Sequence, residues 1–323
     1  MKNILLLIVL ALCLNTQSAS AQMLSKGVSK ELAEYRKANI SKIVYDLSFE
    51  IPANLRQHVE GKVIISFNLK APQDVILDFL GDFDGNCYAH IEKKKGKTKR
   101  IPFKASYRDE HIILPMEAMQ EGTNKVELEF TASDKALNRN DDYMYTLFVP
   151  DMARSAFPCF DQPDLRAVFV TSLKVPNGWK TMTSDNICQL PTYLYSFVAG
   201  NFQEKTSVHD GRPMRILYRE TDPDKVAQLD QVADEAAQAL KWMEGYTGIA
   251  CPFKEYGMVV LGSRDSHSDA VKDGCGYRQG RAGSQNQYQY RVLLDKAVGQ
   301  DAQFTLFIHY CTPPIFSYCS SAQ

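Results

Sequence analysis

The chain has 323 residues, 37 of them basic and 38 acidic, which gives a formal net charge of −1 at pH 7. This balance argues against a nucleic-acid partner, whose binding depends on neutralising many phosphates, and against electrostatic adhesion to anionic lipid. Hydrophobic residues make up 45% and charged residues 23%, so the chain can bury a core and is not disordered throughout. The length predicts two folded units, or one large unit with an appendage, and the 11% of aromatic residues favours a β-rich interior.

The first 21 residues have the features of a signal peptide. Lys2 gives a positive start, residues 4–14 are an almost unbroken apolar run, and Ala19-Ser20-Ala21 offers the small residues that a signal peptidase needs. The apolar run is shorter than the roughly 20 residues needed to cross a membrane. We therefore expect an exported protein, periplasmic or extracellular, without a membrane span and with a mature chain that begins near Gln22.

Export permits disulfides, but the cysteines do not form a regular framework. Loss of Cys13 with the signal peptide leaves an uneven set without a C-x-x-C pair: Cys87, Cys159, Cys188, Cys251, Cys275, Cys311 and Cys319. An odd, irregular set favours scattered buried thiols with one late bridge as an option.

The mature chain opens with a short helical segment, predicted at residues 29–38, and continues as strands. Apolar residues alternate with polar ones at 45–51, 63–69, 75–79 and 126–130, which is typical of half-buried strands in an antiparallel sandwich. The basic run at 93–100 contains Gly96 and is interpreted as a hairpin tip rather than a binding patch. His111 precedes an apolar stretch, so we expect it to edge a strand rather than to bind metal.

A dense segment lies between two further predicted strands, at 143–149 and 167–175. Pro158 and Pro163 fix the backbone φ angle and exclude a helix there. Asp161 and Asp164 can accept hydrogen bonds from nearby backbone N–H groups, and Arg154 is placed to pair with a carboxylate. The segment therefore predicts an elaborate corner between strands, without a pair of nucleophile and base.

The pattern changes character near residues 205–212. A buried aromatic strand at 191–202 ends the β-rich part. Strands at 214–218 and 256–261 then flank an amphipathic helix of about six turns, which starts at Asp222-Pro223 and is stopped by Gly245 and Gly248. Trp242 on this helix is expected to be a core or staple aromatic rather than a stacking platform. We expect a β-domain over 22–206, an α/β part over 207–261, and a tail without consistent periodicity over 262–323.

Two stretches resemble a known family. One is the corner motif, with Arg154, Phe157, Pro158, Phe160, Asp161, Pro163 and Asp164; the other is residues 191–200, with Tyr193 and Gly200. Over residues 30–261 the chain resembles the aminopeptidase N-like zinc metallopeptidases, also called gluzincin aminopeptidases. The resemblance implies a mainly β fold, in which a saddle-like antiparallel β-sandwich precedes an incomplete α/β fragment that begins a thermolysin-like catalytic domain. It assigns the motif residues a structural role, and it implies peptide substrates and a zinc cofactor in the full-length family.

The departures from the family concern the residues that perform its chemistry. The Gly-x-Met-Glu-Asn loop does not follow Leu261, and Val149 stands where the family's first domain often donates an acidic residue to the substrate's amino group. In the family, H-E-x-x-H places two zinc ligands on one helix face with a glutamate as base. Here no two histidines stand four residues apart: His58, His90, His111, His209, His267 and His309. We therefore expect no catalytic residue, no metal ligand and no cofactor in this chain.

Three interpretations of the function follow. The first is the front portion of an exported aminopeptidase, truncated before the zinc site and inactive alone unless a separate chain supplies the rest. The alternative is a secreted non-catalytic binding module built on the β-domain. The third is a zinc site in the tail, although the spacings match no zinc finger: His267, Cys275, His309, Cys311 and Cys319.

Overall fold

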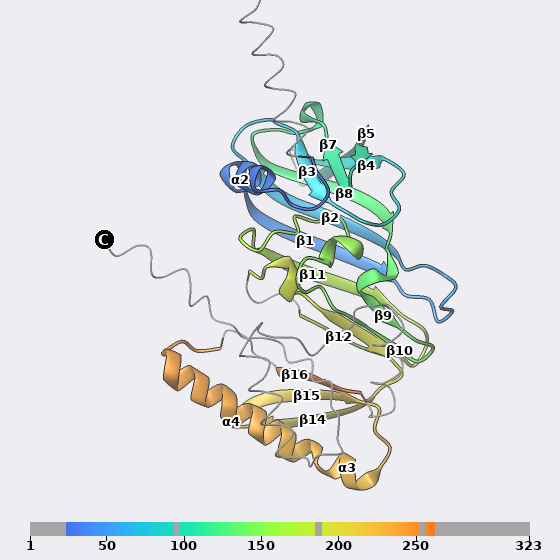
Figure 1. Ribbon diagram of the computed structural model, residues 1–323, viewed down its shortest axis with the longest axis vertical. Coiled ribbons are helices and arrows are strands. Elements are labelled where there is room, and N and C mark those ends of the chain that lie inside the picture. The colour runs from blue at the N-terminus through green and yellow to red at the C-terminus, as the bar shows by residue number, and fades with distance from the viewer. Residues whose placement is uncertain (1–23, 94–96, 185–188, 252–255, 262–323) are drawn as a thin grey trace, which may run out of the picture. The chain divides into compact units, whose positions relative to one another are not determined.

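The computed structural model describes residues 24–93, 97–184, 189–251 and 256–261 of the chain (Figure 1). The expected signal peptide and the expected tail at 262–323 lie outside these ranges. The described residues divide into two compact units: the first holds those up to Asn177 and Thr183–Ala199, and the second holds Gly178–Met182 and those from Gly200 onward. The boundary expected between 206 and 207 lies inside a strand of the second unit, β14 (Gln203–His209).

The first unit begins with the helix that the sequence predicts. In α2 (Lys30–Asn39), Ser29 is the N-cap, and its side chain accepts a hydrogen bond from the backbone N–H of Leu32 at 3.1 Å. Leu32 and Arg36 lie one turn apart on the same helix face, and both are fully buried. The helix therefore presents a charged side chain as well as an apolar one to the interior of the unit.

Six described strands form the main sheet, in the order β11-β1-β2-β8-β4-β5 (Figure 1). They are β1 (Ile40–Glu50), β2 (Glu60–Leu69), β4 (Asn86–Lys93), β5 (Lys97–Lys104), β8 (Gly122–Thr131) and β11 (Ala167–Lys174). All neighbours are antiparallel except β1 and β11, which pair in parallel from Ile43↔Ala167 to Glu50↔Lys174. The prediction of a mainly β, largely antiparallel fold is confirmed.

Two smaller sheets accompany the main one. The first has the order β3-β7-β6, with β3 (Val75–Asp78), β7 (His111–Leu114) and β6 (Ser106–Arg108). The second includes β13 (Phe197–Gly200), β10 (Tyr143–Thr146) and β9 (Leu137–Arg139), in that order. Most of β12 (Lys180–Thr183) belongs to the second unit. Short 3-10 helices lie between these strands: η1 (Met116–Ala118), η2 (Asp134–Ala136), η3 (Ala153–Ser155) and η4 (Thr192–Leu194).

Three elements differ in extent from the sequence prediction. The strand expected at 143–149 ends at Thr146, and a cis bond between Val149 and Pro150 follows it. The strand expected at 191–202 begins as η4, because the N–H of Leu194 donates back to the carbonyl oxygen of Pro191 at 3.0 Å. The basic hairpin tip is shorter than expected, since β4 and β5 stay paired as far as Lys93↔Lys97.

Phe157, in the middle of the corner motif, is a hub of the first unit's aromatic core. Its ring centroid lies 5.8 Å from that of Tyr45, 5.9 Å from that of Phe148 and 6.0 Å from that of Tyr195, each time in edge-to-face geometry. Such pairs contribute about 0.5–1.5 kcal/mol each beyond the burial of their area. Because Phe157 is completely buried, this packing anchors the corner in the core.

The second unit is an α/β structure. Its sheet has the order β14-β15-β16, in which β15 (Arg212–Tyr218) pairs antiparallel with β14 and parallel with β16 (Tyr256–Val260). Two helices, α3 (Pro223–Ala227) and α4 (Leu229–Thr247), lie between β15 and β16 in the chain. The apolar face of α4, which includes Leu229 and Val232, joins a core cluster with residues of the sheet.

The single long helix expected after Asp222 is corrected in three respects. It is interrupted at Gln228, which separates α3 from α4. Gly245 lies inside α4, and the helix ends at Gly248, whose φ of +68° lies in the left-handed region that favours glycine. Trp242 is not a core residue: it is 64% exposed and stacks on Tyr246, one turn further along the outer face, with ring centroids 5.2 Å apart.

The described cysteines include buried thiols and a bridged one. Cys87 and Cys159 are free and buried. Burial raises the pKa of the Cys87 thiol to about 12, so this group stays protonated and unreactive at neutral pH. Cys251 is disulfide-bonded.

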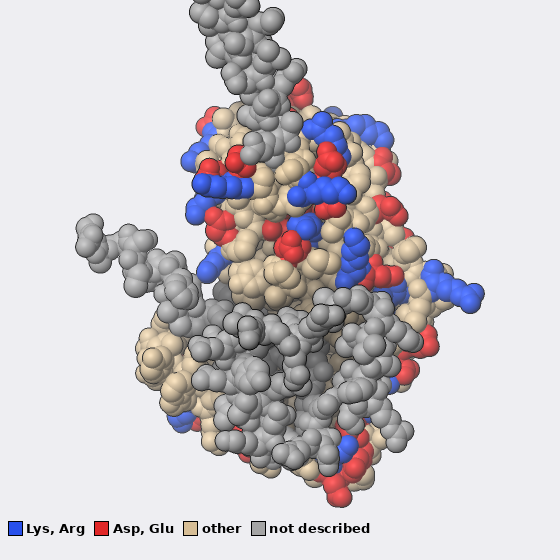
Figure 2. Space-filling model, in the orientation of Figure 1, with Lys and Arg blue, Asp and Glu red and all other residues tan. Residues whose placement is uncertain are grey.

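Basic and acidic side chains are interspersed on the face of the molecule that Figure 2 shows, without a large patch of one sign. This distribution agrees with the near-zero net charge. Within the described ranges, the helices are too short or too polar to cross a membrane.

Candidate functional site

The corner motif between β10 and β11 is fastened to β3 and the residues after it by backbone hydrogen bonds. Asp78 and Cys159 form an isolated β-bridge, with N–O distances of 2.7 and 3.1 Å. Two residues further, the N–H of Leu80 donates to the carbonyl oxygen of Arg154 at 2.8 Å. The corner, which has little regular structure of its own, is therefore ordered by the edge of another element.

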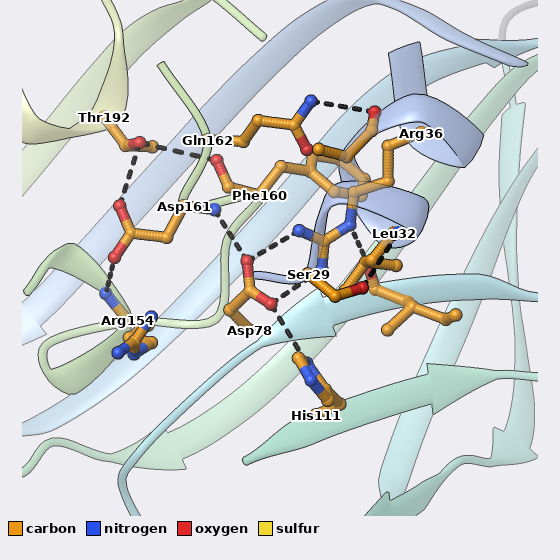
Figure 3. A network of polar contacts seen from close by, with 12 residues as sticks. Ser29, Leu32, Arg36, Asp78, His111, Arg154, Phe160, Asp161, Gln162 and Thr192 are labelled. Carbon is orange, nitrogen blue, oxygen red and sulfur yellow. Dashed lines mark hydrogen bonds and ion pairs between the residues drawn. The ribbon is translucent and has the colours of Figure 1, made fainter. Parts of the chain in front are cut away.

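The carboxylate of Asp78 is the hub of a buried polar network (Figure 3). Arg36 donates to both of its oxygens, from Nη1 to Oδ2 at 2.8 Å and from Nη2 to Oδ1 at 2.7 Å. The backbone N–H of Asp161 donates to Oδ2 at 2.9 Å, and Nδ1 of His111 lies 3.0 Å from Oδ1. Since Arg36 is on α2 and His111 on β7, four separate parts of the fold meet at one carboxylate.

Positive groups keep this buried carboxylate ionised. Burial alone raises the pKa of Asp78. The Arg36 guanidinium, the His111 ring and the hydrogen bonds lower it by more than burial raises it, and the pKa is about 2. The guanidinium also lies over the ring of Phe160, 5.6 Å from its centroid. Because neither Asp78 nor Arg36 has any exposed side-chain surface, removal of either partner leaves a buried charge without compensation.

Asp161 is the second acid of the network, and its surroundings have the opposite effect. Its carboxylate accepts hydrogen bonds from the backbone N–H of Arg154 at 3.1 Å and from Oγ1 of Thr192 at 3.2 Å. Burial, and then the nearby negative charge of Asp78, raise the pKa of Asp161 to about 6 in spite of these bonds. The Arg154 guanidinium pairs instead with Asp151, with Nη2 3.0 Å from Oδ2. Asp161 is therefore a group that takes up a proton in mildly acidic solution.

The residues of the family motif lie at three depths in the structure. Those that are buried are Phe157, Pro158, Phe160, Asp161 and Gly200. Arg154 and Tyr193 are half-buried, and Pro163 and Asp164 are exposed. The carboxylate of Asp164 contacts two side chains, accepting from Nε2 of Gln162 at 2.7 Å and pairing with Lys37 at 3.0 Å. The motif thus serves as a structural connection between the core and helix α2.

Three members of the network, Arg36, Asp78 and His111, are not predicted from the sequence as parts of a buried site. A signal exists for two of them, because Asp78 interrupts the apolar run 75–79 and Arg36 follows Leu32 by one helical turn. A charge at a position that the apolar period assigns to the core predicts a buried partner. The sequence does not show that these two charges, 42 residues apart, are each other's partner.

A Ser–His–Asp series of contacts occurs in the second unit. Oγ of Ser207 lies 2.6 Å from Nε2 of His209, and Nδ1 of His209 lies 2.5 Å from Oδ1 of Asp234. These contacts belong to a row of side-chain links between the β14–β15 hairpin and α4, the others being Lys205–Asp230, Asp210–Lys241 and Arg212–Glu244. Because the whole row fastens the helix to the hairpin, we assign the Ser–His–Asp series a structural role rather than a catalytic one.

The described residues do not fit the zinc ion that the family resemblance implies. Among them, no group of three or more His, Cys, Asp or Glu side chains is arranged to hold a metal ion. In the corner network, Asp78 stays negatively charged, and Asp161 can bind and release a proton.

Comparison with known proteins identifies the first unit. Residues 41–192 match the family model of the Peptidase M1 N-terminal domain. This match, over slightly less than half of the chain, makes the first unit similar to the N-terminal domain of the aminopeptidase N-like enzymes. Aminopeptidase N of Streptomyces lividans is 28% identical over 183 residues, or 48% of this chain, and endoplasmic reticulum aminopeptidase 1 of Homo sapiens is 28% identical over 134 residues, or 36% of this chain.

The chain spans a small part of those relatives, 21% of the Streptomyces protein and 14% of the human one. A solved mutant of an M1 zinc metallopeptidase from Deinococcus radiodurans has a TM-score of 0.52 at 18% identity, over 68% of this chain and 56% of that chain. At this level of identity the likeness concerns the fold. It agrees with an M1-type β-domain as the first unit.

Proposed function

We propose that this chain supplies the N-terminal β-domain and the beginning of the catalytic domain of an exported zinc aminopeptidase, and that it does not hydrolyse peptides by itself. The match of residues 41–192 to the Peptidase M1 N-terminal domain supports the first part. The activity assigned to the whole enzyme is the removal of N-terminal amino acids from peptides, after the aminopeptidases that the chain resembles.

One observation carries the proposed inactivity: the sequence contains no H-E-x-x-H. Peptide hydrolysis at neutral pH needs an activated nucleophile, such as a metal-bound water with a pKa near 7, and a carboxylate that shuttles the proton. The described part of the chain offers no metal site for the first requirement. Loss of the nucleophile itself lowers a rate by many orders of magnitude rather than by a modest factor.

The test uses the purified chain from Gln22 onward. We expect far less than one zinc per chain by metal analysis after dialysis against a weak chelator. We also expect no turnover above background on alanyl, leucyl or arginyl chromogenic amides, with or without added zinc. An intact aminopeptidase N in the same buffers is the positive control. Turnover that co-purifies with the chain and is abolished by a chelator contradicts the proposal.

Export is a separate part of the proposal, supported by the residue pattern at 1–21. N-terminal sequencing of the protein recovered from an extracytoplasmic fraction checks it. The expected first residue is Gln22, whereas a retained Met1 in a cytoplasmic fraction contradicts export. Co-purification of a second chain that carries H-E-x-x-H would show that the remainder of the enzyme is supplied separately.

A further inference from the structure

A short segment before α2, residues 24–29, lies against the first unit; we refer to it as the N-terminal strap. Gly27 has a φ of +80°, a backbone conformation that glycine adopts without strain. Leu24 is 8% exposed and packs with Leu32 and Ile76 in a small apolar cluster. The carbonyl oxygen of the next residue, Ser25, accepts a hydrogen bond from Nε2 of His111 at 2.9 Å. The strap is therefore held by an apolar contact at Leu24 and a hydrogen bond at Ser25.

Both ring nitrogens of His111 face oxygen atoms that can only accept or that carry negative charge. Because a carbonyl oxygen accepts, Nε2 carries a proton towards Ser25. Nδ1 lies 3.0 Å from Oδ1 of Asp78 (Figure 3), but the direction is not that of a hydrogen bond, so the contact is electrostatic. A neutral ring would leave an unprotonated, electron-rich Nδ1 3.0 Å from the carboxylate, whereas an imidazolium is attracted by that negative charge. With a side chain that is 1% exposed, His111 has no water to relieve that repulsion.

The charged groups around the ring come from β3, from α2, from the turn before β7 and from the strap. Asp78 on β3 favours the protonated ring, and Arg36 on α2 opposes it. In the strap, Lys26 pairs with Glu110, which precedes His111, at 3.8 Å. Burial lowers the pKa of His111. The contacts with Asp78 and with the Ser25 carbonyl raise it by more than burial lowers it, so the pKa lies above its ordinary value.

We propose that protonated His111 is a clasp that keeps the N-terminal strap closed, and that loss of its proton opens the strap and uncovers the apolar cluster beneath Leu24. A group with a raised pKa in the folded state contributes stability that is complete below its ordinary pKa of 6.5 and is lost as the pH rises through the folded value. The strap is thus closed in acidic solution and opens as the pH rises through the raised pKa of His111. Asp78 stays ionised down to about pH 2, so its negative charge is present throughout the pH interval in which His111 loses its proton.

Trypsin cleavage after Lys26 reports on the strap, since this side chain is 73% exposed but its backbone is cleaved only when the strap leaves the surface. The chain from Gln22 onward is treated at pH 7 to 9, and mass spectrometry follows the new N-terminus at Gly27. An unstructured peptide of the strap sequence corrects for the pH dependence of trypsin. We expect the corrected rate to rise roughly tenfold for each pH unit above the pKa of His111.

Two variants separate the clasp from a general effect of pH. His111→Gln is expected to be cleaved rapidly already at pH 7, without further dependence on pH. His90→Gln is the matched control, because His90 is another strand histidine in contact with a carboxylate, that of Glu127 at 2.6 Å, and it does not contact the strap. It is expected to behave like the unaltered chain. Protection of Lys26 at pH 7 in His111→Gln would overturn the proposal.

A measurement on the unaltered chain keeps the test decisive even where His111→Gln unfolds the first unit. The ring of His111 is titrated by NMR together with the methyl groups of Leu24. We expect a pKa above 6.5 and a shift of the Leu24 signals in the same transition. A His111 pKa at or below 6.5, or Leu24 signals that do not follow it, would overturn the proposal.

Discussion

The ion pair of Arg36 and Asp78 stabilises the first unit only while both partners are present. In Asp78→Asn, the guanidinium remains in a site without solvent exposure and loses its counter-charge. We expect the free energy of unfolding to fall by about 3–5 kcal/mol. Urea denaturation, followed by the near-ultraviolet circular dichroism of the aromatic core, measures this change.

Glu50→Gln is the matched control for that experiment. It breaks an exposed pair, in which Nζ of Lys174 lies 2.7 Å from Oε1 of Glu50 and the side chains are 75% and 59% exposed. Exposed pairs contribute little, so the free energy of unfolding is expected to change by less than about 1 kcal/mol. Equal decreases in the free energy of unfolding in the two variants would show that burial does not determine how much the Asp78 pair contributes to stability.

The carboxyl group of Asp161 predicts a pH dependence of stability. Its pKa is about 6 in the folded chain against an ordinary 3.8, so the folded state binds the proton more tightly. The stability that it contributes is therefore complete below pH 3.8 and is lost as the pH rises towards 6. Two pKa units correspond to roughly 2–3 kcal/mol.

Asp161→Asn is expected to remove this slope, because the amide oxygen still accepts from the corner but no longer titrates. Urea midpoints between roughly pH 4 and 6 measure the difference between the two chains. The other network acid acts outside this window, since the pKa of Asp78 lies at about 2. An unchanged slope in the variant would assign the titration to another group.

At the scale of the elements, the contact between β2 and β8 depends on the absence of a side chain at Gly61. A Cβ there would lie 2.3 Å from the Phe130 ring, and that ring is itself packed against Phe49 and Phe79, at 5.9 and 5.5 Å between centroids. We expect Gly61→Ala to lower the free energy of unfolding of the first unit by about 1–3 kcal/mol.

Gly245→Ala is the comparison for this glycine, because a Cβ at that helical position would meet nothing within 4 Å. It is expected to stabilise the second unit by about 0.5–1 kcal/mol through helix propensity. Thermal unfolding of the two variants measures both effects. A stabilised Gly61→Ala would mean that Phe130 gives way without loss of packing.

The sequence predicts those elements whose periodicity is set locally. β1 and β2 alternate because one face is buried, and α2 begins where Ser29 can cap it. The break at Gln228 has no comparable signal, since apolar residues recur at helical spacing on both sides of it. The corner is predicted from its prolines, but its connection to Asp78 depends on the pairing of distant strands. Local sequence patterns do not predict which distant strands pair.

At the scale of the whole molecule, the first unit is expected to fold without the residues after 206. The six strands of its main sheet, the Asp78 network and the aromatic core around Phe157 all lie before Gly200. A chain of this length buries roughly 70% of its unfolded surface. A fragment of residues 22–206 is expected to unfold cooperatively in urea. The same fragment with Asp78→Asn is its control, and equal stability of the two would show that the native network has not formed.

The parallel pairing of β1 with β11 has a consequence for how the first unit folds. β1 is among the earliest strands of the chain, yet the strand on its other side comes last in the main sheet, after β2, β4, β5 and β8. Until β11 arrives, a long edge of β1 carries unpaired backbone groups, and closing so large a loop is entropically slow. Open edges recruit strands from neighbouring molecules. We therefore expect the refolding yield to fall as the protein concentration rises. In a chain that ends before Lys174, part of the edge of β1 stays unpaired and open to association with other molecules.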